Sequence, residues 1–171
     1  MLDRIRRFFD QHIAADLRDV SAPRRGMGAG GDSDHALHMA TAALLLEVSR
    51  ADFHVHDKEL AAIAGILQRQ FEFGDDETRE LLDVARSESD EMLSLHPFVR
   101  LINEHFDGKA RARIIEDLWH VAYADGKLDK YQEYTVRKIA DLLYVPHSVY
   151  IRAKLKAEEG VRDKIPEAGD N

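Results

Sequence analysis

Apolar residues recur at intervals of three and four along most of this chain, which is the spacing of one face of an α-helix. Runs of β-branched residues are rare, while Ala, Leu, Glu, Arg and Lys, all good helix formers, dominate. Gly, Pro and short acidic stretches interrupt the pattern and divide it into seven expected helices. Their approximate ranges are 34–51, 57–71, 75–85, 94–106, 108–124, 129–144 and 146–159. The pattern therefore predicts an all-α protein, a compact bundle of about seven helices.

An additional amphipathic helix is expected at the N-terminus, over residues 1–19, where apolar residues recur at helical spacing opposite Arg and Asp. The Gly-rich segment 20–33 that follows is typical of a flexible linker. The expected organisation is completed by a helical domain over 34–160 and a frayed tail over 161–171. The N-terminal helix is thus predicted to be tethered to the domain.

An internal repeat appears when the chain is shifted by 73 positions against itself. Leu46 then falls on Trp119, Asp52 on Asp125, and further apolar positions also coincide. Each copy has a helix, then Ala-Asp, two residues, one apolar residue (Val55 or Leu128) and a second helix. We expect two helix–acidic-turn–helix units with pseudo-twofold character, in which that apolar residue packs into the core.

The two turns resemble a known family signature. The segment from Val121 to Lys130, followed by Gln132 and Glu133, is similar to the Ala-Asp-Gly-x-(Ile/Leu/Val)-x-x-x-Glu motif of TerB-like (tellurite resistance) proteins. The segment from Ala51 to Glu59 resembles the same motif, and the likeness covers about residues 34–158. The resemblance implies a compact helical fold, acidic turns that bind metal, and a role in tellurite resistance or membrane-linked stress systems. It implies no enzymatic activity.

Two positions depart from that motif. Phe53 stands where the motif has Gly, and Gln132 stands where its Glu is expected. Glu133 is adjacent to Gln132, but one residue along a helix turns a side chain by roughly 100°. The second copy is therefore expected to hold the weaker or rearranged acidic site.

The acidic residues of the turns are candidate ligands for a divalent cation such as Ca²⁺ or Mg²⁺, which prefer several oxygen ligands. The candidates are Asp52, Asp57 and Glu59 in the first copy and Asp125, Asp129 and Glu133 in the second. Acidic residues at a helix N-terminus also cap free N–H groups and interact favourably with the helix dipole. Purely structural turns are therefore the alternative to metal binding.

His54 and His56 flank the first turn and are secondary candidates, because imidazole together with carboxylates can bind Zn²⁺ or other transition metals. A histidine at such a position is more often simply solvated on the surface. Both interpretations stay open at the level of sequence.

Charge and composition limit the remaining functions. The net charge is −8, and residues 1–25 hold six Arg against four Asp, so the acidic excess lies in the rest of the chain. An acidic body disfavours nucleic acid as a partner, because phosphate binding needs a basic surface. The absence of Cys excludes thiolate zinc sites and Cys nucleophiles. No phosphate-binding Gly loop and no Gly-x-Ser-x-Gly elbow occurs, so we expect a non-enzymatic binding module.

Location and partners follow from the same features. No apolar run approaches the roughly 20 residues that span a bilayer, and no signal peptide is recognisable, so a cytoplasmic protein is expected. Residues 1–18 are expected to dock on protein: an unknown partner, this chain itself or a second copy of it. Their Arg and neighbouring Asp balance, which predicts only weak membrane association. The alternative function is a membrane-peripheral or protein–protein adaptor that uses this helix, with acidic turns that are purely structural.

Overall fold

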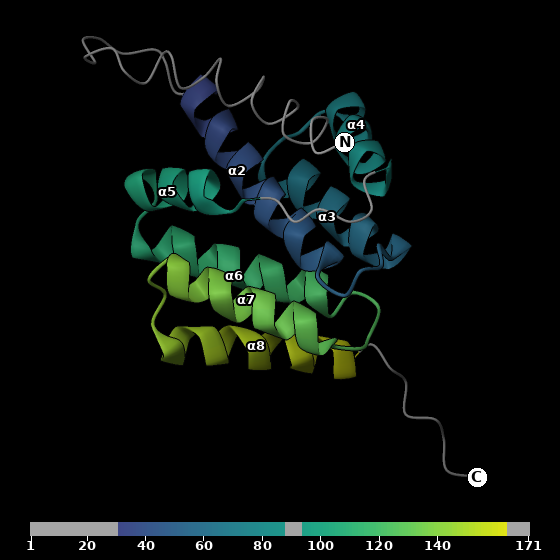
Figure 1. The fold of residues 1–171 in the computed structure, drawn as a ribbon, viewed down its shortest axis with the longest axis vertical. Coiled ribbons are helices and arrows are strands. Elements are labelled where there is room, and N and C mark those ends of the chain that lie inside the picture. The colour runs from purple at the N-terminus through teal and green to yellow at the C-terminus, as the bar shows by residue number, and fades with distance from the viewer. Residues whose placement is uncertain (1–30, 88–93, 164–171) are drawn as a thin grey trace.

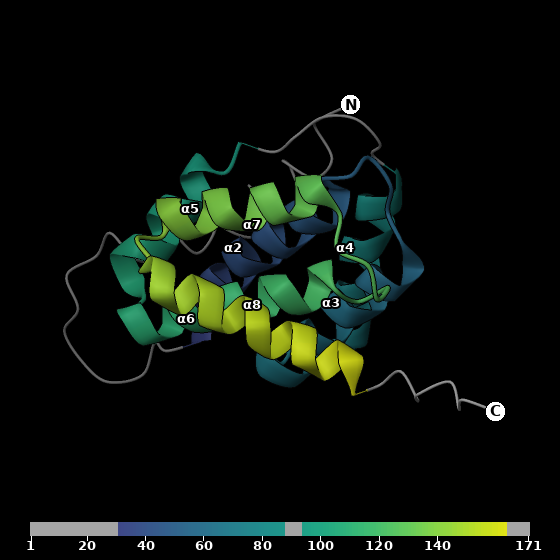
Figure 2. The same cartoon turned by 90° about the horizontal axis from the view of Figure 1, so that it is seen from below.

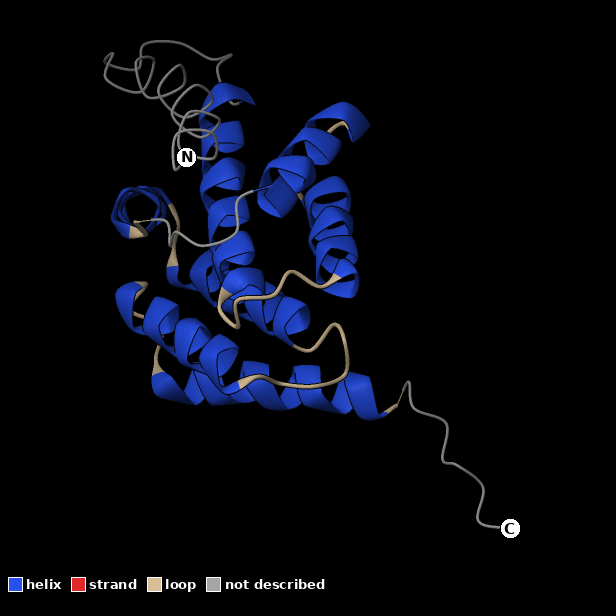
Figure 3. Cartoon of the chain, turned by 45° about the vertical axis from the view of Figure 1, so that its right-hand side comes forward, coloured by secondary structure: helices blue, strands red, loops and turns tan. Residues whose placement is uncertain are grey.

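The computed structural model describes residues 31–87 and 94–163, and within these residues every regular element is a helix (Figures 1 and 3). The helices are α2 (Gly31–Arg50), α3 (Asp57–Gln70), α4 (Asp75–Ser87), α5 (His96–His105), α6 (Gly108–Ala122), α7 (Lys130–Leu142) and α8 (His147–Arg162). The predicted all-α fold with seven helices in the main domain is confirmed.

The expected helix boundaries differ from the observed ones at both ends of the domain. Helix α2 begins at Gly31, so the last residues of the predicted linker 20–33 are helical. Helix α8 continues to Arg162, two residues into the predicted tail 161–171. Apolar spacing marks the buried middle of a helix and carries little information about exposed ends, which explains both differences. The predicted N-terminal helix 1–19 lies outside the described residues.

Helix α2 is the central helix of the bundle. It packs against α3, α5, α6 and α7, and all of its residues from Met39 to Ser49 are buried. Its segment 42–46 is wholly apolar, Ala-Ala-Leu-Leu-Leu, as expected for a helix that is surrounded by others. Helix α6 is the second central element, and its Trp119 is fully buried beside Tyr150 of α8, with ring centroids 5.4 Å apart.

The remaining helices cover this centre. Helix α4 packs on α3, α5 packs on α2, and α8 lies along α6, as the view from below shows (Figure 2). Pro97 lies in the first turn of α5, where its missing N–H is not needed. No helix among the described residues has the length and apolar character that crossing a membrane requires.

The two copies of the repeat form two helix pairs, α2–α3 and α6–α7, and these pairs pack reciprocally. The first helix of each pair contacts the second helix of the other, α2 with α7 and α6 with α3. As a result, the turn after α2 and the turn after α6 lie side by side at one edge of the bundle (Figures 1 and 3). The acidic residues of both turns therefore gather in one region.

Candidate metal site

Both turns are built on an aspartate that holds the backbone two residues ahead. Asp52 Oδ1 accepts a hydrogen bond from the backbone N–H of His54 at 3.0 Å, and Asp125 Oδ1 accepts one from the N–H of Lys127 at the same distance. Aspartate favours such local bonds because its short side chain reaches its own backbone. The first oxygen of each aspartate is therefore engaged within the turn.

The residues that follow the aspartates share an unusual backbone conformation. Phe53 has φ 64° and Gly126 has φ 85°, and each donates its backbone N–H to a carbonyl at the end of the preceding helix. Two residues further on, Val55 and Leu128 are partly buried against the core, as the sequence predicts. The two turns thus follow the same path, with the same 73-residue offset as the sequence.

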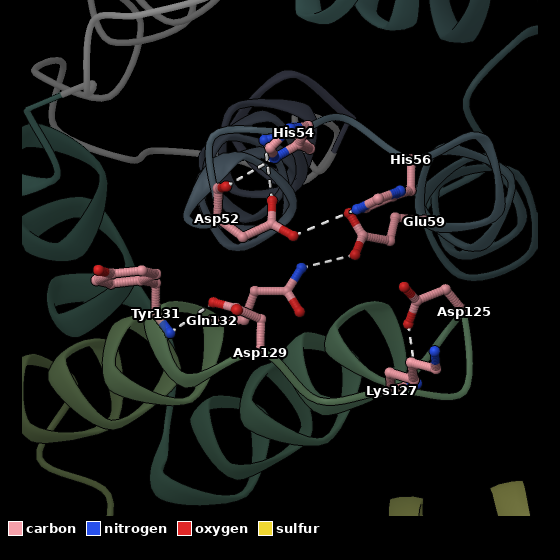
Figure 4. Close-up of polar contacts among 9 residues, drawn as sticks. All are labelled: Asp52, His54, His56, Glu59, Asp125, Lys127, Asp129, Tyr131 and Gln132. Atoms are coloured by element: carbon pink, nitrogen blue, oxygen red, sulfur yellow. Dashed lines mark hydrogen bonds and ion pairs between the residues drawn. The ribbon is translucent and has the colours of Figure 1, made fainter.

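The N-cap residues of the two following helices behave differently. Asp129, the N-cap of α7, accepts a hydrogen bond from the backbone N–H of Tyr131 at 2.7 Å. His56 occupies the equivalent position before α3 and makes no side-chain cap. Its ring is directed at the aspartate of its own turn, and Nε2 lies 3.3 Å from Asp52 Oδ2 (Figure 4).

One buried hydrogen bond joins the two copies. The side-chain amide of Gln132 donates to Glu59 Oε1 at 2.6 Å, and both side chains are buried, Glu59 completely (Figure 4). These residues are 73 positions apart and are therefore each other's counterparts in the repeat. The second carboxylate oxygen, Glu59 Oε2, is buried and has no hydrogen-bond partner in the part of the chain that the structure describes. A buried acceptor without a partner lowers the stability of the folded state, and buried acceptors are accordingly nearly always paired in folded proteins.

Asp52, His56 and Glu59 together form a cluster of candidate ligands. One ligand atom from each lies within 4.8 Å of the other two. The cluster reaches from the surface into the core, since the side chain of His56 is 42% exposed, that of Asp52 14%, and Glu59 is fully buried. Within residues 31–87 and 94–163, the acidic residues of the second turn form no comparable group.

The electrostatics of the cluster favour a bound positive charge. The pKa of Glu59 is raised from its ordinary 4.5 to about 7, chiefly by burial and to a smaller extent by the carboxylates of Asp52 and Asp125. The hydrogen bond from Gln132 and the proximity of His56 act in the opposite direction. A cation between Glu59 and Asp52 would offset both the desolvation and the repulsion.

The structure separates the other predicted ligands from this cluster. Asp57 is exposed in the first turn of α3, and the Asp125 and Asp129 side chains bond the backbone of the second turn. Glu133 pairs with Lys154 of α8. Asp125 and Asp129 therefore make the backbone bonds that are expected of purely structural turns, the alternative to metal binding.

Of the two secondary candidates, His56 joins the cluster and His54 does not. His54 Nδ1 lies 3.0 Å from the Asp52 backbone oxygen, and its ring stacks on that of His56 at 6.1 Å between centroids. Sequence reasoning missed Gln132, which holds Glu59. The 73-residue shift that aligns Asp52 with Asp125 also aligns Glu59 with Gln132, so the signal was present.

Comparison with protein families identifies the family of this chain. The family model described as tellurite resistance protein TerB matches residues 38–155, which include both acidic turns, α3, α6 and α7, and most of α2. No curated protein and no solved structure gives a significant match. The match spans more than half of the chain, and the chain therefore belongs to the TerB family.

Proposed function

We propose that this protein is a non-enzymatic binding module that holds one divalent cation at Asp52, His56 and Glu59. The observation that carries the proposal is the unpartnered, fully buried Oε2 of Glu59, which lies within reach of two further ligand atoms. A purely structural turn explains why Asp52 Oδ1 bonds the backbone. It does not explain why the carboxylate of Glu59 is buried with one oxygen unpaired.

In this proposal the two turns have different tasks. The first turn supplies the ligands, while the second supplies Gln132, whose amide orients Glu59. Membership of the TerB family supports a role in tellurite resistance. In this proposal, other proteins of the cytoplasm recognise the cation-loaded turn as part of that role or of a wider stress response.

The test is calorimetric titration of the full chain with divalent cations, comparing the wild type with Glu59→Gln. This substitution keeps an acceptor for Gln132 and removes the charge and the free carboxylate oxygen. We expect its affinity for the cation to fall at least about tenfold.

Glu133→Gln is the matched control, because it makes the same chemical change at the neighbouring acidic turn, outside the cluster. Its cation affinity is expected to stay at the wild-type value. Equal binding by wild type and Glu59→Gln, or no binding by either, would rule out the proposed function.

A further inference from the structure

In each carboxylate of the cluster, one oxygen is held by a backbone or side-chain amide N–H and the other is not. The backbone N–H of His54 occupies Asp52 Oδ1, and the side-chain amide of Gln132 occupies Glu59 Oε1. The remaining oxygens are Asp52 Oδ2, which lies 3.3 Å from the third candidate ligand, His56 Nε2, and the buried Glu59 Oε2, so each carboxylate can contribute one oxygen to an ion. Gln132 presents its N–H group to the cluster, so its amide adds no oxygen ligand on that side.

The third ligand atom is a nitrogen, Nε2 of His56. In the second copy the equivalent residue, Asp129, caps its helix with its side chain. His56 makes no side-chain cap, and its ring contacts Asp52 instead. Imidazole is a poor helix cap and a good ligand for transition metals. The choice of histidine here is explained by the cluster and not by the stability of α3.

On the proposed function, we infer that the site selects a transition metal ion of the Zn²⁺ or Co²⁺ type over Ca²⁺ and Mg²⁺. Ca²⁺ takes roughly six to eight oxygen ligands, and Mg²⁺ binds through carboxylates and water without nitrogen. One imidazole and two monodentate carboxylates match the ligand types of zinc sites in which three protein ligands leave the fourth position open for water. The exposed side of His56 lets water complete the coordination.

The experiment titrates the full chain separately with ZnCl₂, CoCl₂, CaCl₂ and MgCl₂, and records the visible absorption of the Co²⁺ complex. We expect Zn²⁺ to bind at least about 100-fold more tightly than Ca²⁺ or Mg²⁺. His56→Asp makes the first turn match the second at its N-cap, so the variant is expected to fold. It should lose at least about tenfold in Zn²⁺ affinity, change its Co²⁺ spectrum, and bind Ca²⁺ no more weakly.

His54→Asp is the matched control, since it removes the neighbouring imidazole and should leave Zn²⁺ binding and the Co²⁺ spectrum unchanged. An equal loss in both His variants overturns the assignment of His56. Binding of Ca²⁺ or Mg²⁺ as tight as that of Zn²⁺, abolished by Glu59→Gln, overturns the selectivity and retains the proposed function. If none of the four ions binds, the proposed function itself fails.

Discussion

At the scale of single residues, Phe53 and Gly126 occupy the same point of the two turns with positive φ, at which a side chain is strained. Phe53 is 68% exposed, so it gains little from burial. We expect Phe53→Gly to raise the free energy of unfolding by about 1 kcal/mol and Gly126→Ala to lower it by about 1 kcal/mol. Urea denaturation in the presence of a chelator measures both.

Gly108→Ala is the control for this pair. Gly108 and Gly126 both have open space where a Cβ would be added, but only Gly126 has a positive φ. A cost at Gly108 equal to that at Gly126 would mean that backbone conformation is not the cause.

The site could be predicted in part from single residues. Asp52 and Glu59 are recognisable as candidates from the motif. Their proximity is also expected, because the turn brings the ends of two helices together. His56 was indistinguishable from a solvated histidine, since its ring direction depends on the missing cap. Its charge makes Glu133 a candidate ligand in the sequence, yet the neighbouring Gln132 occupies the position that faces Glu59. Helical rotation of roughly 100° per residue decides between them.

At the scale of elements, periodicity was sufficient to predict all seven helices of the described domain, because each buries an apolar face. Helix ends were less predictable. The 73-residue offset aligns the two turns and the first residues of α3 and α7. It no longer aligns the ends of these two helices, because α3 has 14 residues and α7 has 13. The 73-residue shift pairs Phe71 with Tyr144. In the structure Phe71 is the C-cap of α3 and Leu143 is the C-cap of α7, so the structural counterpart of Phe71 is Leu143.

The N-caps give a prediction at this scale. Asp129→Ala should lower the free energy of unfolding by about 1 kcal/mol, and Asp107→Ala should have a similar effect, because Asp107 Oδ1 accepts from the N–H of Ala110 at 2.8 Å. His56→Ala should cost clearly less in metal-free protein, since His56 makes no such bond. Urea denaturation decides, and an equal loss at His56 would contradict the assignment of its ring to the cluster.

At the scale of the whole molecule, a partly buried polar contact links the two helix pairs. Gln70 of α3 donates to Asp117 of α6 at 3.0 Å, and burial raises the pKa of Asp117 above its ordinary 3.8. The folded state therefore holds this proton more tightly than the unfolded chain. The resulting stabilisation is present at low pH and is lost as pH rises through the pKa of the folded protein.

Asp117→Asn removes this titration and keeps an acceptor for Gln70. The difference in unfolding free energy between Asp117→Asn and wild type should shift in favour of the variant as pH increases upward from about 4. Denaturation curves at several pH values between 4 and 7, with a chelator present, measure that difference. A gap that stays constant or reverses would show that Asp117 is not the group responsible.

The packing of the two pairs against each other was the least accessible to sequence reasoning. Apolar periodicity shows which face of a helix is buried but not which other helix covers it. The repeat makes reciprocal packing of α2 with α7 and α6 with α3 a reasonable expectation, yet only the structure brings Glu59 onto Gln132.

That contact depends on the two halves sharing one chain. In a symmetric homodimer, a residue on the twofold axis meets its own copy, so glutamate would face glutamate and the two carboxylates would need a shared proton or a cation between them. A duplicated chain escapes this restriction, because its two halves can diverge. Here one half keeps the acid and the other supplies a neutral donor. Duplication within a single polypeptide is therefore what permits a lone, oriented carboxylate at the meeting point of two similar turns.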